Sequence, residues 1–319
     1  MNELRRDYFT DTWVVIATDR ARKPTDYVKV KTPVEHIKCD CAFCPGCEHL
    51  TPPSKASYYA RDTGTVIEAD VDGTPPGTGW MSRVIPNMYP AVRQEVPAGF
   101  EGRPAIGIHE VIVESPEHTR HPQFMSDKEL KLLFSIYRDR FREASAVPYI
   151  EYVSVFRNYG RDAGASQSHP HSQLIALPIT PSAIKDQYDK NYEDVLHAEE
   201  RSPRLISGTE HTIAFTPYAS IAPYEVRIFP RKPCRNIAEM TDEERDDMAC
   251  MTGDILARMS RILNDPPYNY GFVQSLSRPL HMHLRIVPKL GIEAGFELNT
   301  GMHINSVPPE EACKNLRNA

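Results

Sequence analysis

Ser166-Gln-Ser-His-Pro-His-Ser-Gln173 leads directly into the apolar run Leu174-Ile-Ala-Leu-Pro178. Side chains alternate between the two faces of a strand, so His169 and His171 lie on the same side of an extended segment. Pro170 between them has a fixed φ and no N–H, which stiffens the pair and disfavours a helix. The stretch therefore predicts two imidazoles held side by side at the rim of a sheet.

The composition is that of a globular protein. The chain has 319 residues, of which 40% are hydrophobic and 25% charged, and its formal net charge is −6. This balance supports a real core and argues against nucleic acid or an anionic membrane surface as the main partner. No apolar run approaches the roughly 20 residues of a membrane helix, and the first residues lack the apolar segment of a signal peptide. We therefore expect a cytoplasmic protein that binds neither nucleic acid nor membrane.

One pattern of predicted elements occurs twice along the chain. The matched pairs are 109–116 with 224–230, 125–129 with 240–244, 148–156 with 267–273, and 169–178 with 281–288. Each half reads as a strand, a helix, a strand, a loop and a His-x-His strand. Successive strands with one covering helix predict an α+β fold, with mainly antiparallel sheets and covering helices. We place the boundary between the two domains at 1–180 and 181–319.

The two predicted helices have the same start signal. Ser126 and Thr241 are N-cap residues, and a glutamate follows each of them at the capping-box position. The amphipathic patterns that follow continue to about residue 145 in the first half and 263 in the second.

The halves differ in their chemistry. Where the first half has Gln173 two residues after its second histidine, the second half has Arg285. The loop before the second His-x-His strand also lacks the small-residue run of 160–168. The sequence therefore predicts a catalytic N-terminal domain and a C-terminal domain with a degenerate site.

Four cysteines lie within nine consecutive residues of the N-terminal domain. They are Cys39, Cys41, Cys44 and Cys47. Cys41-Ala-Phe-Cys44 has the spacing that lets two thiolates share one tetrahedral zinc ion. The outer two cysteines would complete a local site, whereas His118 and His169 would tie the cysteine loop to two strands. Buried thiols without a metal are a third interpretation, and the spacing alone leaves all three open.

The residues around the histidine pair suit transfer of a phosphoryl group. Gly160, Gly164 and their small neighbours form a loop whose backbone N–H groups can approach an anion. A neutral imidazole, here His171, is a nucleophile toward phosphorus that divides a transfer into two steps. Gln173 would donate a neutral hydrogen bond to the phosphoryl oxygens but cannot act as a general acid. This arrangement favours transfer between phosphates over hydrolysis.

At these residues the chain resembles the histidine-triad superfamily in its nucleotidyltransferase branch, which includes galactose-1-phosphate uridylyltransferases and plant ADP-glucose phosphorylase. The resemblance extends over nearly the whole chain. It rests on Arg20-Ala-Arg-Lys-Pro24, Cys41-Ala-Phe-Cys44-Pro-Gly, Asn87, Glu114-Ser-Pro-Glu-His118, Asn158, the run through Gln173, Leu263-Asn-Asp-Pro-Pro-Tyr268 and Gly295-Phe-Glu297 to Asn305. It implies a duplicated histidine-triad-like fold.

The resemblance also implies roles for particular residues. His171 would attack the α-phosphorus of a nucleotide sugar, release a sugar 1-phosphate and carry the nucleotidyl group to a second sugar 1-phosphate. The other implied roles are phosphoryl contacts for Gln173 and Ser166; nucleotide and phosphate contacts for Arg20, Asn87, Asn158 and Gly164; zinc ligands at Cys41, Cys44, His118 and His169; and sugar contacts for Phe296 and Glu297. Because the last two would reach the partner subunit's active site, the resemblance implies a homodimer.

The sequence departs from the family pattern at a second metal site that some members carry. Gln187 stands at the position of a glutamate ligand, and Val273 stands at the position of a histidine ligand. Only His281 and His283 remain, so we expect no second metal. Lys23 also replaces a common arginine, which weakens a bidentate phosphate contact there.

Three functions follow as hypotheses. The first is a uridylyltransferase that exchanges UDP between glucose and galactose 1-phosphates. The second is an adenylyl-transferring phosphorylase that acts on ADP-glucose or adenylylsulfate with phosphate as acceptor. Proline in His-Pro-His favours the first, because the plant phosphorylase type has serine there; the segments Asn264-Asp-Pro-Pro-Tyr268 and Gly295-Phe-Glu-Leu-Asn-Thr-Gly301 favour the second. A binding protein without turnover is disfavoured because both His171 and Gln173 are present.

Overall fold

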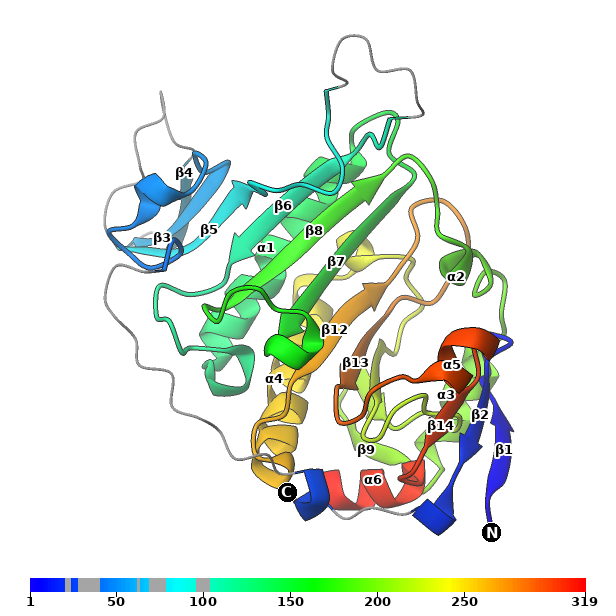
Figure 1. Cartoon of the computed structure of the whole chain (residues 1–319). Helices are drawn as coiled ribbons and strands as arrows, with labels where there is room; N and C mark the ends of the chain where they lie inside the picture. The colour runs from blue at the N-terminus through cyan, green and yellow to red at the C-terminus, as the bar shows by residue number, and fades with distance from the viewer. Residues whose placement is uncertain (21–23, 28–40, 62–63, 69–78, 96–103) are drawn as a thin grey trace.

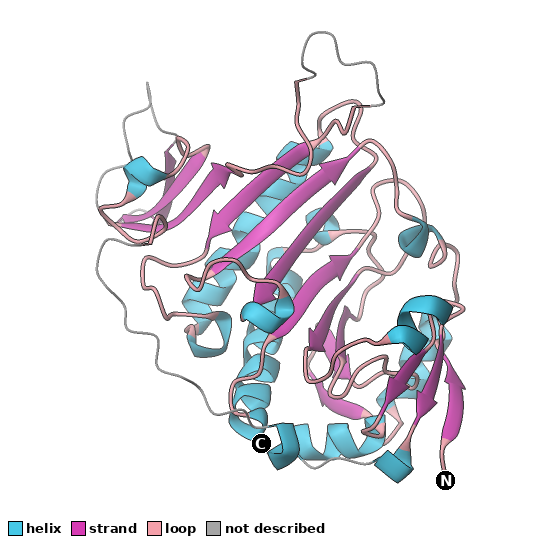
Figure 2. Ribbon diagram, viewed as in Figure 1, coloured by secondary structure: helices cyan, strands magenta, loops and turns pink. Residues whose placement is uncertain are grey.

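A single large sheet spans most of the protein (Figures 1 and 2). The computed structural model describes residues 1–20, 24–27, 41–61, 64–68, 79–95 and 104–319. Within them, the sheet has eleven strands in the order β4-β3-β5-β6-β8-β7-β12-β13-β11-β10-β9. Neighbouring strands in it run antiparallel throughout. The predicted α+β class with mainly antiparallel pairing is confirmed.

The strand bounds follow the order of the sheet. They are β4 (Gly64–Glu68), β3 (Ala56–Arg61), β5 (Trp80–Pro86), β6 (Ile108–Val113), β8 (His171–Leu177), β7 (Tyr152–Tyr159), β12 (Tyr268–Val273), β13 (His283–Pro288), β11 (Val226–Pro230), β10 (Thr212–Phe215) and β9 (Leu205–Gly208). A second, smaller sheet contains β1 (Glu3–Arg6), β2 (Trp13–Ile16) and β14 (His303–Asn305), and β14 pairs with β2 in parallel.

The repeat in the sequence appears as two copies of one unit joined edge to edge. The order β6-β8-β7 in the first half is followed by β12-β13-β11 in the second, so the order reverses across the β7–β12 pair. Helices α1 (Asp127–Ser145) and α4 (Asp242–Leu263) lie side by side behind this part of the sheet (Figure 1). Both begin with a capping box, at Ser126 and Thr241, as the sequence predicts.

Short helices complete the chain. The α-helices are α2 (Ser182–Lys185), α3 (Tyr192–Glu200), α5 (Gly295–Thr300) and α6 (Pro309–Arg317). The 3-10 helices are η1 (Thr18–Arg20), η2 (Pro24–Tyr27), η3 (Glu48–Leu50), η4 (Pro122–Phe124), η5 (Arg161–Ala163) and η6 (Ile237–Glu239). No helix in the described part of the chain is both long and apolar enough to cross a membrane.

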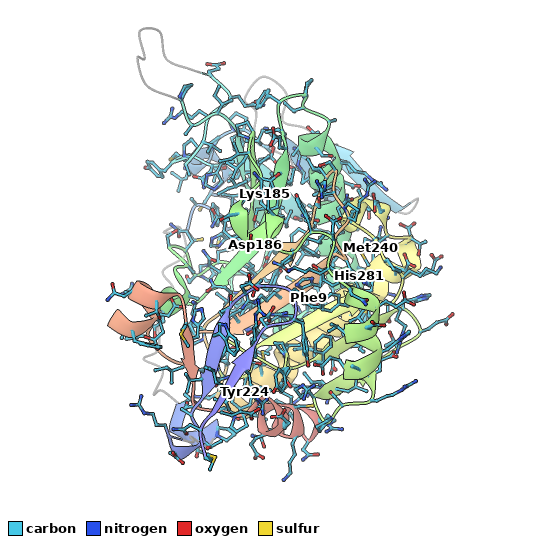
Figure 3. The ribbon with its side chains drawn as sticks, turned by 90° about the vertical axis from the view of Figure 1, so that its right-hand side faces the viewer. Phe9, Lys185, Asp186, Tyr224, Met240 and His281 are labelled. Carbon is cyan, nitrogen blue, oxygen red and sulfur yellow. The ribbon has the colours of Figure 1, made fainter. Side chains whose placement is uncertain are left out.

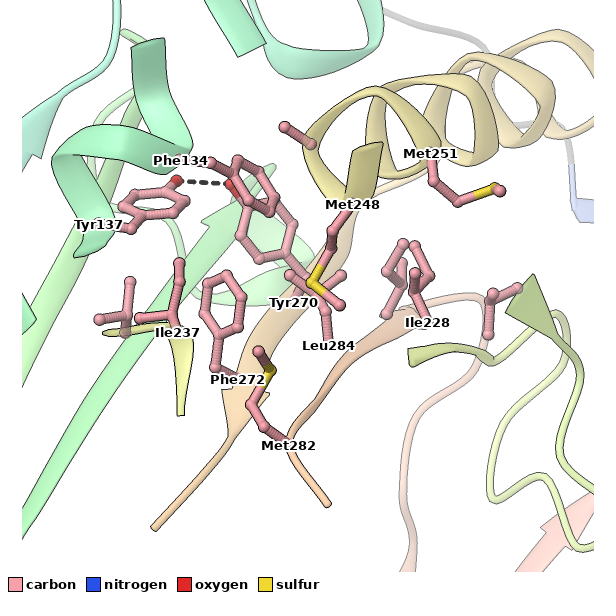
Figure 4. Close-up of a cluster of buried hydrophobic side chains, with 14 of the residues drawn as sticks. Phe134, Tyr137, Ile228, Ile237, Met248, Met251, Tyr270, Phe272, Met282 and Leu284 are labelled. Atoms are coloured by element: carbon pink, nitrogen blue, oxygen red, sulfur yellow. Dashed lines mark hydrogen bonds between the residues drawn. The ribbon is translucent and has the colours of Figure 1, made fainter. Parts of the chain in front are cut away.

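The main core lies between the two long helices and the sheet. Figure 4 shows side chains of both helices meeting those of β12, β13 and β11, and the hydroxyls of Tyr137 and Tyr270 lie 2.6 Å apart within this group. The helices approach closely at Gly253, where an added Cβ would lie 2.3 Å from Leu130 Cδ1. One continuous core therefore supports both halves.

A second group of buried rings ties the N-terminal segment to the second half. The Phe9 ring stacks on Tyr192 at 4.2 Å between centroids, and Phe229 stacks on His283 at 4.3 Å. Figure 3 shows Phe9 and His281 within the body of the protein. The first residues of the chain thus pack on the C-terminal half.

A buried ion pair joins β7 to the end of β6. Arg157 Nε lies 3.0 Å from both carboxylate oxygens of Glu114, and these side chains are 1% and 0% exposed. The same guanidinium contacts His121 Nδ1 at 2.8 Å and donates to the Tyr268 hydroxyl at 3.1 Å. A buried charge needs such partners because desolvation disfavours it.

We therefore predict that Arg157→Met destabilises the protein by about 3–5 kcal/mol, because it leaves the Glu114 carboxylate buried without its main partner. Urea unfolding measures the change. Adding Glu114→Gln should recover part of the loss. The matched control is Arg6→Met on the surface, where the partner Asp11 is 81% exposed and the cost should stay within about 1 kcal/mol. Equal losses for Arg157→Met and Arg6→Met would contradict the prediction.

Candidate active site and metal centre

Four side chains that can bind a metal come together beside the start of β8. They are Cys41, Cys44, His118 and His169, and their potential ligand atoms all lie within 4.8 Å of one another. The Nδ1 atoms of the two histidines are 3.4 Å apart, and Cys44 Sγ lies 3.3 and 3.5 Å from them. Ligands of a tetrahedral zinc at ~2.0–2.3 Å are separated by about 3.3–3.8 Å. The donor types and spacings fit one tetrahedral ion.

Both histidines of this metal group have a hydrogen-bond partner on the nitrogen that faces away from it. His169 Nε2 lies 2.8 Å from the carbonyl oxygen of Ser115, and His118 Nε2 lies 2.9 Å from the hydroxyl of Ser168. A carbonyl oxygen can only accept, so His169 carries its proton on Nε2 and directs the Nδ1 lone pair to the centre of the group. Outer partners of this kind fix ring orientation in metal sites.

His171 is the first residue of β8 and is buried. Its Nδ1 donates to the carbonyl oxygen of His169 at 2.8 Å, which leaves the lone pair on Nε2. Burial lowers the pKa of His171, although the His169 carbonyl acts in the opposite direction. The Phe43 ring, from the loop between the two cysteines, lies 5.5 Å from the His171 ring. The structure thus places a neutral imidazole of fixed orientation against the loop that carries Cys41 and Cys44.

Gln173 lies on the same face of β8 as His171 and contacts His109, which in turn contacts Asn87. Its Oε1 atom is 2.9 Å from His109 Nε2, and Asn87 Nδ2 is 3.0 Å from the same nitrogen. The N–H of Ala91 donates to His109 Nδ1 at 3.0 Å, so the neutral ring carries its proton on Nε2. In that tautomer His109 donates to Gln173 Oε1 and accepts no hydrogen bond from the Asn87 NH₂ group, and the NH₂ group of Gln173 is left to donate elsewhere.

The small-residue loop after β7 has the backbone that its glycines allow. Gly160 and Gly164 have φ values of +81° and +85°, which residues with a Cβ rarely adopt. A Cβ on Gly164 would lie 3.9 Å from Asn158 Nδ2. Ser166 is exposed on this loop. The structure therefore brings Asn158 and Gly164 together next to the His171 strand, with Ser166 on the same loop.

A cavity of about 400 Å³ opens beside this group. Asn87 and His109 line it, together with the cationic residues Lys55 and Arg93. The His109–Gln173 contact connects the cavity to the histidine strand. This volume is in the range of small-molecule sites.

Three predicted residues lie elsewhere. Arg20 ends η1, and Phe296 and Glu297 lie on α5, which sits near β2 and β14 in Figure 1. Backbone hydrogen bonds at the start of α5 lower the pKa of Glu297, and Arg20 contributes to the same effect. Phe296 is 43% exposed. The described residues show no contact between these three side chains and His171 within one chain.

The second half has the same histidine geometry in different surroundings. His283 Nδ1 lies 3.2 Å from the His281 carbonyl oxygen, and His281 Nε2 lies 2.8 Å from the Pro230 carbonyl oxygen. At the position of Gln173, Arg285 Nε donates to Glu225 Oε1 at 2.7 Å. In the described part of the chain, the group of Cys41, Cys44, His118 and His169 is the only one of its kind.

Two residues weighed in the sequence lie outside the described residues, Cys39 and Lys23. Cys47 is buried in the same turn as the metal group but is not part of it.

Comparison with known proteins gives relatives over the whole length. ADP-glucose phosphorylase of Arabidopsis thaliana is 30% identical over 339 aligned positions, covering 99% of this chain and 92% of that protein. Galactose-1-phosphate uridylyltransferase of Thermotoga maritima is 27% identical, covering 99% and 98%. The family described as "Domain of unknown function (DUF4921)" matches residues 124–319. The chain belongs to the galactose-1-phosphate uridylyltransferase and ADP-glucose phosphorylase family.

Solved structures of this family agree in fold. The crystal structure of Arabidopsis thaliana ADP-glucose phosphorylase with bound ADP-glucose has a TM-score of 0.79 at 28% identity, covering 100% of this chain and 99% of that one. A uridylyltransferase structure has a TM-score of 0.71 at 25% identity, covering 100% and 98%. These likenesses confirm the predicted family and fold, and the protein is a nucleotidyltransferase.

Sequence reasoning missed side chains whose importance depends on strand pairing. His109 faces Gln173 because β6 and β8 pair antiparallel with Val111 opposite Gln173. In the sequence, Phe43 is one of two residues between Cys41 and Cys44, and nothing there indicates its contact with His171. The alternation of His109, Val111 and Val113 predicts that these side chains share one face of a strand. It does not predict which residues of the neighbouring strand lie opposite them.

We predict that the neutral His171 ring carries its proton on Nδ1, whereas His169 carries its proton on Nε2. Long-range ¹H–¹⁵N NMR at pH 7 distinguishes the two tautomers. The signal is assigned by its loss in His171→Asn, and His169 is the internal control because it donates through the other nitrogen. An Nε2–H tautomer on His171, or a protonated ring at this pH, would refute the assignment.

Proposed function

We propose that the protein transfers a nucleotidyl group from a nucleotide sugar to a phosphate-bearing acceptor through His171. The observation that carries this proposal is the hydrogen bond from His171 Nδ1 to the His169 carbonyl oxygen at 2.8 Å. The bond leaves the lone pair on Nε2, and His171 lies on the same face of β8 as Gln173, directly after the small-residue loop. A nucleophile with a fixed lone pair and nearby phosphoryl donors is the requirement for covalent transfer.

The reaction has two balanced displacements. In the first, Nε2 of His171 forms a bond to the α-phosphorus, and the bond from that phosphorus to the bridging oxygen breaks, which releases sugar 1-phosphate. In the second, a phosphate oxygen of the acceptor attacks the same phosphorus, and Nε2 leaves with its electron pair. Between the steps the ring is cationic and keeps its Nδ1 proton, so the His169 carbonyl stabilises it.

Gln173 would bind the phosphoryl oxygens through its NH₂ group. The His109 contact takes its oxygen, and the amide nitrogen is the donor that remains. Because the leaving group is a phosphate of low pKa, no acid is needed to protonate it. Asn158, Gly164 and Ser166 would hold the neighbouring phosphates, and the cavity bounded by Asn87 would hold the nucleoside.

The likenesses favour ADP-glucose as the donor and phosphate as the acceptor. The relative named ADP-glucose phosphorylase is 30% identical, and its structure holds ADP-glucose at a TM-score of 0.79. The second candidate is the uridylyltransferase reaction between UDP-glucose and a hexose 1-phosphate. Pro170 between the two histidines supports this candidate, and so does the 27% identity to the Thermotoga maritima enzyme.

We propose zinc as the ion of the metal group. Two thiolates and two imidazoles are the donor set of structural zinc sites. The ligands would be Cys41, Cys44, His118 and His169, and such an ion would hold the cysteine loop against β8. His169 would then be structural while His171 reacts.

We further propose a homodimer in which Phe296 and Glu297 complete the partner's sugar site. The position of α5 away from β8 in Figure 1, together with the exposure of Phe296, supports this arrangement. Arg20, near the same helix, would act there as well. The functional boundary at 180/181 and a cytoplasmic location remain part of the proposal.

The donor is tested with ADP-glucose and UDP-glucose labelled at the α-phosphorus. We expect ADP-glucose to label the protein, and His171→Asn to abolish the label because it removes the nucleophile. The matched control is His283→Asn, the same position in the second half, which should keep the label. Labelling by UDP-glucose alone would assign the uridylyl reaction. No label from either, or label that survives in His171→Asn, would refute the covalent mechanism.

The metal proposal predicts about one zinc per chain by elemental analysis. Cys44→Ser should lose most of it, because a hydroxyl is a poor zinc ligand. Cys47→Ser is the matched control and should retain zinc, since Cys47 is not in the metal group. Loss of zinc in Cys47→Ser would support the local cysteine site instead. A content near two would show that the second half binds metal.

A further inference from the structure

A residue of the second half reaches the candidate site of the first. Asn269 lies on β12 directly opposite Asn158 on β7, at the seam where the two halves of the large sheet meet. Residues opposite each other in an antiparallel pair share one face. Phe156 pairs with Gln173, so Asn158, two residues further along β7, shares the face of Gln173 and His171, and Asn269 lies on that face too.

The amide of Asn269 makes two hydrogen bonds from one nitrogen. Nδ2 donates to the backbone carbonyl oxygen of Ala163 at 2.8 Å and to Asn158 Oδ1 at 2.8 Å. A carbonyl oxygen can only accept, so the atom of Asn269 that faces Ala163 must be the NH₂ group. The atom of Asn158 that faces the same NH₂ group must then be its oxygen. Consequently, the NH₂ group of Asn158 points away from Asn269.

The direction of the Asn158 amide is toward the small-residue loop. The nearest atom to a Cβ built on Gly164 is Asn158 Nδ2, at 3.9 Å. The N–H of Gly164 bonds back to the Arg161 carbonyl oxygen at 3.0 Å, within the turn whose Ala163 carbonyl Asn269 holds. One side chain of the second half thus fixes both the Asn158 amide and the turn beside it.

The start of the same loop also rests on the second half. A Cβ on Gly160 would lie 2.8 Å from Pro267 Cβ, two residues before Asn269. The hydroxyl of Tyr159 donates to Asp265 Oδ2 at 2.6 Å. The end of β7 and the loop after it are therefore seated on residues 265–269 at three points.

We propose that Asn269 is a positioning residue for nucleotidyl transfer. It holds the Asn158 amide with its NH₂ group toward the phosphates and keeps the glycine loop open for them. The inference rests on the proposed function, because Asn158 and the loop bind phosphate only in that proposal. Asn269 itself touches neither the phosphates nor His171. The second half thereby acts on the reaction without a nucleophile of its own.

Asn269→Asp is the sharpest variant because it keeps the size of the side chain and removes both donors. A carboxylate would repel the Ala163 carbonyl and turn the Asn158 amide over, so that its oxygen faces the loop. We expect the single-turnover labelling rate to fall about 10- to 100-fold, as for other outer-sphere partners of a site. The matched control is Asn236→Asp, whose Nδ2 donates to the Ser275 carbonyl oxygen at 2.9 Å in the second half. It should keep the wild-type rate.

A double-mutant cycle separates positioning from support of the fold. Asn269→Ala should slow labelling in the wild-type background and much less in Asn158→Ala, because both act through one amide. An equal slowing in both backgrounds, or an Asn269→Asp rate within threefold of wild type in a folded protein, would overturn the inference alone. Absence of labelling in the wild type would instead refute the proposed function, and the inference with it.

Discussion

The pairing of β7 with β12 is the constraint on which the arrangement of the protein depends. It joins two copies of one unit into a single sheet, since the strand order reverses across it. Because the copies meet edge to edge, their long helices lie together on one side and share a core. The opposite face is left for polar side chains from both halves. Asn158 and Asn269 meet there only because the register places them opposite each other.

The metal group acts on the candidate nucleophile through the backbone as well as through packing. His169 contributes its side chain to the group and its carbonyl oxygen to His171 Nδ1. Phe43, inside the Cys-x-x-Cys loop, packs on the His171 ring. Ser168 binds His118 and belongs to the small-residue loop. Anything that orders the four side chains of the metal group therefore also orders the candidate nucleophile and the small-residue loop.

Local sequence signals predicted the helices and strands, whereas the pairing of the strands decided which side chains come into contact. Capping boxes at Ser126 and Thr241 depend on residues three apart, so the helix starts and the repeat were readable. The Cys-x-x-Cys spacing indicated a metal site, but the choice of His118 and His169 as its candidate ligands required the family resemblance. His109 and Asn269 were not found, because each acquires its role from a strand distant in sequence. Register across such a pair follows from the fold as a whole.

The two His-x-His copies show why one half carries the candidate chemistry. His171 and His283 both donate through Nδ1 to the carbonyl two residues before, so the backbone device is the same. The neighbours differ: Gln173 presents a neutral amide, whereas Arg285 is bound to Glu225. A guanidinium paired with a carboxylate attracts a phosphoryl group only weakly, because the two charges of the pair largely cancel. The carboxylate itself would repel the phosphoryl group. An amide brings a donor without that opposing charge, so the surroundings of His171 suit a transferring phosphoryl group better than those of His283 do.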